Sequence, residues 1–270
     1  MSDASPALLL HAAADVARVA GDLALRHFRA GPAGGAIAVE TKGDGSPVTA
    51  ADRAAEQAAR AWLAERFPAD GVLGEEFGLE RPDARRRWIL DPIDGTKTFV
   101  RGVPLWGTLV ACVEGDGPNA TVLAGAAYFP AVGELVAAAP GEGCWWNGAR
   151  ARVSSVDALG RALVCTTDPK FSHRPDRRAG WRRVEDAALL ARTWADCYGY
   201  LLVATGRAEA MSDAVTGDWD SAALLPIVEE AGGVFTTWEG VRSGLGGSAV
   251  ATNGALADAV RGLLADPSAG

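Results

Sequence analysis

The sequence predicts an α+β fold, or an α/β fold with two sheets. Helical and strand patterns occur in both halves of the chain, and three consecutive apolar runs in its middle, split by turn residues, indicate an antiparallel meander. No internal repeat and no long linker interrupts the 270 residues. We therefore expect two fused subdomains, residues 1–140 and 141–270, with a cleft between them.

The first half opens with two helical patterns. Apolar residues recur at helical spacing over residues 7–28, and a second pattern runs from residue 50 to residue 67, with Thr49 as its N-cap and Pro68 as its stop. Short strands are expected over residues 71–74 and 87–90, the latter ending at Asp91. The meander is expected over residues 109–113, 121–128 and 134–139.

The second half alternates short strands with helices, and glycines end several of these helices. Strands are expected over residues 163–166, 208–212, 234–237 and 249–252. Helices are expected over residues 181–190, 196–204, 219–231 and 256–264.

Composition excludes several classes of protein. The chain has 26 Lys and Arg against 34 Asp and Glu, a net charge of −8, so it has no basic stripe for nucleic acid. No apolar run approaches the ~18 residues that span a membrane, and the N-terminus has no basic signal-peptide region. The four cysteines are widely and irregularly spaced, which predicts neither a zinc site nor a disulfide framework. We expect a cytoplasmic protein with a small-molecule partner.

Two carboxylates at a strand end indicate where the chemistry lies. Residues 91–96 read Asp-Pro-Ile-Asp-Gly-Thr and directly follow an expected strand, so Asp91 and Asp94 should share one rim. Gly95 allows close approach of a ligand, and Thr96 can begin a helix whose amides favour an anion. Carboxylates without Cys or His select hard cations such as Mg²⁺ or Mn²⁺. Taken alone, the same residues also fit a solvated turn.

Two further acidic segments narrow the interpretation. Glu75 and Glu76 follow a short strand, and Asp220 precedes an apolar helix; alone these would be a solvated turn and an N-cap. In this order, Gly-Glu-Glu, Asp-Pro-Ile-Asp-Gly-Thr and Trp-Asp-Ser-Ala-Ala-Leu resemble the inositol monophosphatase family over nearly the whole chain. The resemblance implies a layered αβαβα sandwich of the inositol monophosphatase/fructose-1,6-bisphosphatase type. It also implies a lithium-sensitive, magnesium-dependent phosphomonoesterase, commonly a homodimer.

The resemblance assigns roles to individual residues. Thr96 and Asp52 match the pair that orients the attacking water, and Glu75 and Asp94 also belong to the catalytic set. Amides of Gly95 and Thr96 would hold the phosphate. Lys42 resembles a loop lysine of the family, or is a surface charge. Two or three Mg²⁺ ions, with Mn²⁺ as a substitute, would be held by Glu75, Asp91, the Ile93 carbonyl, Asp94 and Asp220.

Residues that touch the leaving alcohol should select the substrate. Residues 192–200 resemble the Trp-Gly-Asp-Cys-Tyr signature of the histidinol-phosphatase branch, with Ala195 where that branch commonly has glycine. Alignment by motif places Asp196, Cys197 and Asp213 beside the leaving alcohol. Asp94 and Asp220 are also expected to contact the substrate. Two carboxylates would pair with the ammonium and imidazole of L-histidinol phosphate, an intermediate of histidine biosynthesis. Alternatively, Asp196 is a helix N-terminal charge.

Other functions stay open at this point. The chain could instead hydrolyse inositol 1-phosphate or other sugar and nucleotide phosphates. A phosphate-binding or scaffold protein of the same fold would show no phosphatase activity. His11, His27 and His173 lie outside every motif and are expected on the surface or in the core, and Trp145 and Trp146 in the core and a hairpin.

Overall fold

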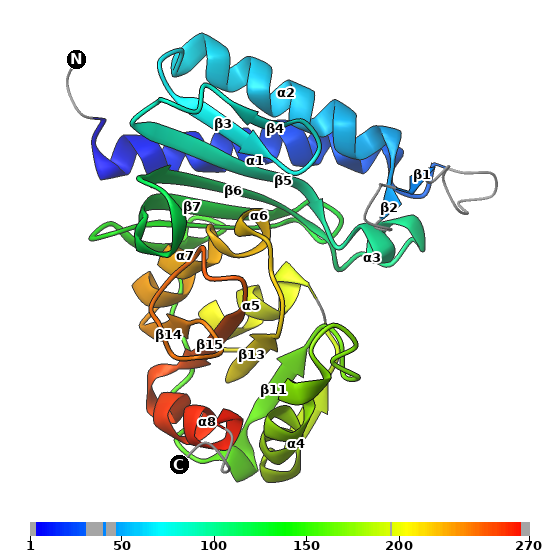
Figure 1. Cartoon of the computed structure of the whole chain (residues 1–270), viewed down its shortest axis with the longest axis vertical. Helices are drawn as coiled ribbons and strands as arrows, with labels where there is room; N and C mark the ends of the chain where they lie inside the picture. Colours follow the sequence, from blue (N-terminus) through cyan, green and yellow to red (C-terminus); the bar gives the residue numbers. More distant parts are fainter. Residues whose placement is uncertain (1–3, 31–39, 42–46, 195, 266–270) are drawn as a thin grey trace.

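The computed structural model describes residues 4–30, 40–41, 47–194 and 196–265, so Lys42 and Ala195 lie outside the described residues. The chain forms five layers, which confirms the αβαβα prediction (Figure 1). Two long helices cover an eight-stranded sheet, two helices separate that sheet from a five-stranded one, and two helices cover the far side. In that order the helices are α1 (Pro6–His27) and α2 (Ala50–Arg66), α5 (Cys197–Ala204) and α7 (Leu224–Glu230), and α4 (Arg178–Ala187) and α8 (Ala257–Leu264).

The outer helices begin where the sequence predicts. Ser5 caps α1 by accepting the N–H of Leu8, and Pro6 occupies its first turn. Thr49 caps α2 in a capping box, in which the Asp52 carboxylate accepts the Thr49 N–H at 2.8 Å. Small buried alanines let α1 lie close to the sheet and to α2. The short strands β1 (Glu40–Thr41) and β2 (Pro47–Val48) form a two-stranded sheet just before α2.

The eight-stranded sheet has the order β10-β9-β8-β7-β6-β5-β3-β4, and only β3 and β5 pair in parallel. The expected meander is confirmed in β6, β7 and β8. The same sheet continues through the hairpin of β9 and β10, which contains Trp145 and Trp146, as far as Arg150. The division of the chain into two subdomains near residue 140 stays a prediction. The strands are β3 (Gly71–Gly74), β4 (Gly78–Glu80), β5 (Arg86–Asp94), β6 (Gly107–Glu114), β7 (Thr121–Phe129), β8 (Glu134–Ala139), β9 (Gly143–Trp146) and β10 (Ala149–Arg150).

The five-stranded sheet has the order β12-β11-β13-β15-β14, with parallel pairing of β11 to β12 and β13. Its two faces pack on different helix layers, α5 and α7 on one side and α4 and α8 on the other. Its strands are β11 (Leu163–Thr166), β12 (Leu190–Arg192), β13 (Ala210–Asp213), β14 (Gly233–Thr236) and β15 (Ala249–Asn253).

Two helix predictions were wrong in extent. The helix expected over residues 219–231 is divided into α6 (Asp218–Ser221) and α7. Pro226 explains the break, because it has no N–H to donate to the carbonyl of residue 222 and its ring crowds that carbonyl. The helix expected over residues 181–190 ends at Ala187, because Leu190 instead pairs with Leu163 as the edge strand β12. No helix in the described ranges is long and apolar enough to cross a membrane.

Candidate active site

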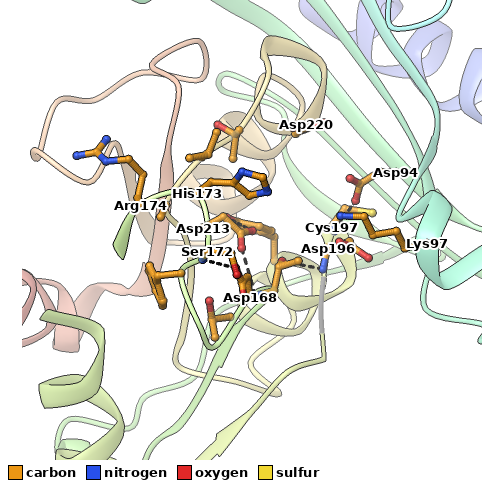
Figure 2. Close-up of a pocket in the computed structure, with 17 residues that line it drawn as sticks. Asp94, Lys97, Asp168, Ser172, His173, Arg174, Asp196, Cys197, Asp213 and Asp220 are labelled. Carbon is orange, nitrogen blue, oxygen red and sulfur yellow. Dashed lines mark hydrogen bonds between the residues drawn. The ribbon is translucent and has the colours of Figure 1, made fainter. Parts of the chain in front are cut away.

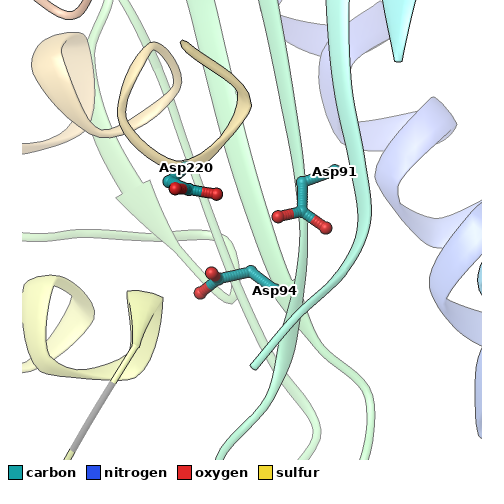
Figure 3. Close-up of side chains that lie close together, drawn as sticks. All are labelled: Asp91, Asp94 and Asp220. Atoms are coloured by element: carbon teal, nitrogen blue, oxygen red, sulfur yellow. The ribbon is translucent and has the colours of Figure 1, made fainter. Parts of the chain in front are cut away.

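Three aspartates meet between the two sheets. One carboxylate oxygen from each of Asp91, Asp94 and Asp220 lies within 4.8 Å of the others (Figure 3). Asp91 and Asp94 belong to β5, whose pairing with β6 shifts register between them, so both side chains reach the same place. Asp220 comes from the one-turn helix α6, which approaches from the other half of the chain. The cluster is therefore a product of tertiary structure.

Backbone amides orient each carboxylate. The N–H of Ile93 donates to Asp91 Oδ1 at 3.0 Å. The N–H of Cys197 donates to Asp94 Oδ2 at 2.6 Å, and the N–H of Gly217 donates to Asp220 Oδ2 at 2.6 Å. Because amides do not rotate as side chains do, the three carboxylates are held before any ligand arrives.

The cluster is electrostatically unfavourable without a cation. Burial and the neighbouring carboxylates raise the pKa values of Asp91 and Asp94 well above the ordinary range, and burial is the main cause of a rise in the pKa of Asp220 to about 7. Oxygen donors alone, crowded and partly desolvated, match the preferences of a hard divalent cation. The residues therefore fit a metal site.

Glu75 stands beside this cluster. It follows β3, and its N–H donates to the carbonyl of Leu90, the residue before Asp91, at 3.2 Å. Its charge contributes to the raised pKa values of Asp91 and Asp220. Glu75 lies outside the group of oxygens within 4.8 Å, so its role as a ligand, like that of the Ile93 carbonyl, stays a prediction.

The predicted water-orienting pair also lies near β5. The Thr96 hydroxyl donates to the Ile93 carbonyl at 3.1 Å. Asp52 is fully buried; its Oδ2 accepts from the Thr49 N–H and hydroxyl, whereas its Oδ1 has no hydrogen-bond partner within the described part of the chain. A buried acceptor without a donor is costly, and a donor supplied by a ligand or water would remove that cost.

Gly95 occupies a position where a side chain does not fit. It has φ +87° and precedes α3 (Thr96–Val100), and an added Cβ would lie 2.7 Å from Asp196 Oδ2.

We expect Gly95→Ala to lose about 1–2 kcal/mol of stability from backbone strain and also to displace Asp196, lowering kcat/KM. Gly148→Ala is the matched control, since Gly148 has φ +82° and open space around its Cβ. The temperature of unfolding should fall in both variants, but kcat/KM should fall only in Gly95→Ala. Equal kcat/KM values for the two variants would show that Asp196 tolerates the displacement.

A cavity of about 450 Å³ opens beside the cluster (Figure 2). Asp94, Asp196, Cys197, Asp213 and Asp220, all predicted from the sequence to contact substrate, line it. Several other residues of its wall were not predicted from the sequence: Lys97, Thr166, Thr167, Asp168, Phe171, Ser172, Arg174, Tyr200 and residues 214–216.

Asp196 has an unusual conformation. Its φ is +53°, which is rare for any residue but glycine, and its carboxylate does not cap α5. Instead Asp196 Oδ2 accepts from the Thr98 hydroxyl at 3.1 Å, and the Asp196 N–H donates to Thr167 Oγ1 at 3.0 Å. Asp196 directly precedes α5, so the alternative interpretation as a charge at a helix N-terminus stays open, although its side chain makes no capping hydrogen bond.

Asp213, the last residue of β13, also lines the cavity. Its carboxylate accepts from the Tyr200 hydroxyl at 2.9 Å and from the Thr167 N–H at 3.2 Å. Burial raises its pKa to about 6, since these hydrogen bonds offset only part of the loss of solvation. Burial likewise raises the pKa of Asp196, and both aspartates line the cavity in addition to Asp94 and Asp220 of the cluster.

His173 is exposed, as expected of a surface residue, but it also lines the cavity (Figure 2). Asp168 stabilises the loop that contains His173, because its carboxylate accepts the N–H groups of Lys170 and Ser172. The sequence around Asp168 could have predicted an ordered turn here, but it does not indicate that this loop lies against the cavity.

The fold, the carboxylate cluster and the adjoining cavity fit an enzyme that binds a divalent cation next to a small-molecule substrate. The chain matches the model of the inositol monophosphatase family over residues 6–266, and it belongs to that family. This confirms the family resemblance and the enzyme class predicted from the sequence.

Three similar proteins illustrate the relationship. A histidinol-phosphatase of Chlorobaculum parvum is 40% identical, covering 92% of this chain and 93% of its own. A histidinol-phosphatase of Mycobacterium tuberculosis is 42% identical, covering 83% and 86%. The solved structure of an inositol monophosphatase from Zymomonas mobilis superposes with a TM-score of 0.80 at 33% identity, covering 94% and 96%.

Proposed function

We propose that this protein is a Mg²⁺-dependent phosphatase that hydrolyses L-histidinol phosphate to L-histidinol and phosphate. The observation that carries the substrate assignment is the pair of carboxylates, Asp196 and Asp213, that face the cavity outside the aspartate cluster. The two similar histidinol-phosphatases, each about 40% identical over most of both chains, support the same assignment.

The metal would be held by Glu75, Asp91, the Ile93 carbonyl, Asp94 and Asp220. When bound, Mg²⁺ neutralises phosphate charge and lowers the pKa of a coordinated water; Mn²⁺ is an expected substitute. Side chains of the protein would orient the attacking water. Thr96 and Oδ1 of Asp52 would position it. The Thr96 hydroxyl lies next to the β5 bulge, where it donates to the Ile93 carbonyl, and Asp52 is near enough to contribute to the raised pKa of Asp91. Asp52 Oδ1 has no hydrogen-bond partner among the described residues, so it is available to a water.

The phosphate and the leaving alcohol would be held by different parts of the site. The amides of Gly95 and Thr96, at the start of α3, would hold phosphate oxygens together with the cluster around Asp94. Asp220 would hold the proton donor for the leaving oxygen. Cys197 would contribute through its backbone N–H, which orients Asp94, since its thiol is buried.

Charge favours an amino alcohol over a polyol. The ammonium and imidazole of histidinol would each gain a charge-assisted hydrogen bond from Asp196 and Asp213. Inositol 1-phosphate, the main alternative, or a neutral sugar phosphate would have to desolvate both carboxylates without neutralising them. Because the chain is similar to a solved inositol monophosphatase structure, inositol 1-phosphate is the second substrate to be assayed.

Asp196→Asn provides that test. A charge-assisted hydrogen bond contributes about 1.5–3 kcal/mol, so we expect kcat/KM for histidinol phosphate to fall about 10- to 150-fold. Phosphate release from inositol 1-phosphate should change little or rise. Asp157→Asn, which alters an exposed aspartate paired with Arg161, neither of which lines the cavity, is the control and should leave both activities unchanged. A wild-type preference for inositol 1-phosphate, or equal losses for both esters in Asp196→Asn, would refute the assignment.

We also propose that the enzyme acts in the cytoplasm as a homodimer of two-subdomain chains, divided near residue 140. These proposals rest on the family resemblance and on the acidic, cysteine-poor composition. Light scattering on the purified full chain would measure the oligomeric state.

A further inference from the structure

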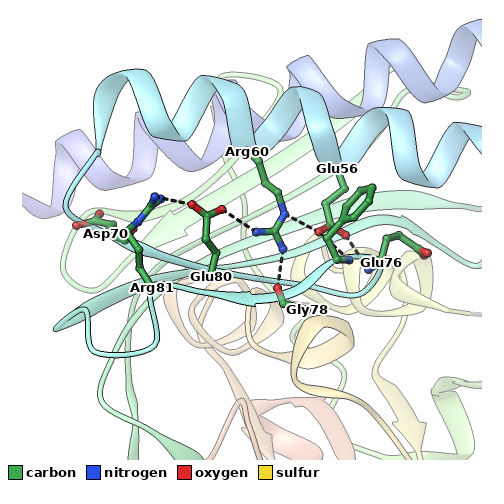
Figure 4. Close-up of polar contacts among 8 residues, drawn as sticks. Glu56, Arg60, Asp70, Glu76, Gly78, Glu80 and Arg81 are labelled. Carbon is green, nitrogen blue, oxygen red and sulfur yellow. Dashed lines mark hydrogen bonds and ion pairs between the residues drawn. The ribbon is translucent and has the colours of Figure 1, made fainter.

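Glu56 is a fully buried glutamate on the inner side of α2 (Figure 4). Its carboxylate accepts the backbone N–H of Glu76 at 2.8 Å and that of Phe77 at 3.3 Å. These two amides belong to the loop that joins β3 to β4. Glu56 therefore ties a long, well-packed helix to a three-residue loop on the edge hairpin.

Arg60, one turn later on α2, completes the attachment. Its Nε donates to Glu56 Oε1 at 2.8 Å, and its Nη2 donates to the Gly78 carbonyl at 2.6 Å, at the start of β4. A Cβ at Gly74 would lie 1.9 Å from Glu56 Oε1, so the glycine makes room for the carboxylate. The helix thus holds the loop by hydrogen bonds at residues 76, 77 and 78 and lies close against it at residue 74.

This loop begins with Glu75. We propose that Glu56 is a positioning residue for the metal site, which fixes the loop so that Glu75 faces the aspartate cluster. The inference rests on the proposed role of Glu75 as a metal ligand. Glu75 lies between Gly74, which contacts the Glu56 carboxylate, and Glu76, whose N–H donates to it.

The arrangement is better suited to positioning than to stability. A buried ion pair gives little net stability over apolar residues of similar volume, because both charges lose solvation. Apolar residues, however, could not accept the N–H groups of residues 76 and 77. The strand β4 is at the edge of the eight-stranded sheet, so among the described strands it pairs with β3 alone. The loop between β3 and β4 therefore depends on α2 for further hydrogen bonds. Hydrogen bonds to residues behind a ligand typically change metal affinity 10- to 100-fold.

The test measures metal binding without turnover. Isothermal titration of substrate-free protein with MgCl₂ or MnCl₂ would compare wild type, Glu56→Gln, Glu75→Gln and Asp70→Asn. Asp70→Asn is a matched control, because Asp70 is a buried carboxylate paired with Arg86 and bonded to Trp88 at the opposite end of β3. We expect Glu56→Gln to bind metal about 10- to 100-fold more weakly, and Asp70→Asn to bind as wild type even though thermal unfolding shows both variants destabilised.

The outcomes separate the two proposals. Weakened binding in both Glu75→Gln and Glu56→Gln, but not in Asp70→Asn, supports the positioning role. Wild-type binding by Glu75→Gln would refute Glu75 as a ligand and with it the proposed metal set. Weakened binding by Glu75→Gln with wild-type binding by Glu56→Gln would refute the positioning role alone. If Glu56→Gln does not fold, Glu56→Asp keeps the charge near Arg60 but draws the oxygens back by one methylene, and the same comparison applies.

Discussion

Asp91→Asn should lower phosphate release from histidinol phosphate by at least about 1,000-fold at saturating Mg²⁺. Asp91 is the most buried member of the aspartate cluster, and the substitution removes its charge with almost no change of volume. A bound metal stabilises the transition state by several kcal/mol, and about 4 kcal/mol corresponds to three orders of magnitude in rate. Steady-state assays over a range of Mg²⁺ concentrations would measure the loss.

The same substitution should not destabilise the metal-free protein. Three carboxylates whose oxygens lie within 4.8 Å repel one another, so removing one charge should raise the temperature of unfolding in the presence of a chelator. Asp70→Asn is again the control, with full activity and a lower unfolding temperature, because it leaves Arg86 without its buried partner. Chelator-resistant activity in Asp91→Asn would show that these carboxylates hold no catalytic metal.

Thr96→Ala should reduce kcat by about 100- to 10,000-fold while changing KM little. The substitution removes a hydroxyl bonded to the Ile93 carbonyl but leaves every carboxylate of the cluster in place. Groups that position or accept a proton in the transition state typically contribute this factor, and their loss appears in kcat rather than in KM. Initial rates over a range of histidinol phosphate concentrations would separate the two constants.

A threonine elsewhere provides the comparison. Thr205 also donates its hydroxyl to a backbone carbonyl, that of Leu201 at 2.7 Å, at the end of α5. Thr205→Ala should leave both kinetic constants unchanged. An unaltered kcat in Thr96→Ala, with metal binding intact, would mean that Thr96 only begins α3 and that another group orients the water.

Much of the fold follows from local sequence. The α1 and α2 patterns, the capping box at Thr49 and the meander all depend on neighbours within a few residues, and each was predicted with small errors at the ends. The prediction for residues 219–231 was wrong although its cause is local, because Pro226 divides the helix between α6 and α7. Edge strands such as β12 were missed because their pairing partner lies far along the chain.

The sequence by itself determined the family, the enzyme class and the residues of the aspartate cluster, because short motifs with strict chemical needs carry them. Only the tertiary structure decided what surrounds those motifs. It set Asp196 against Gly95 across about a hundred residues, brought His173 to the cavity, and attached the Glu75 loop to Glu56 on another element. The reason is physical: contacts between elements depend on how layers pack, and packing is a property of the assembled core that no local spacing encodes.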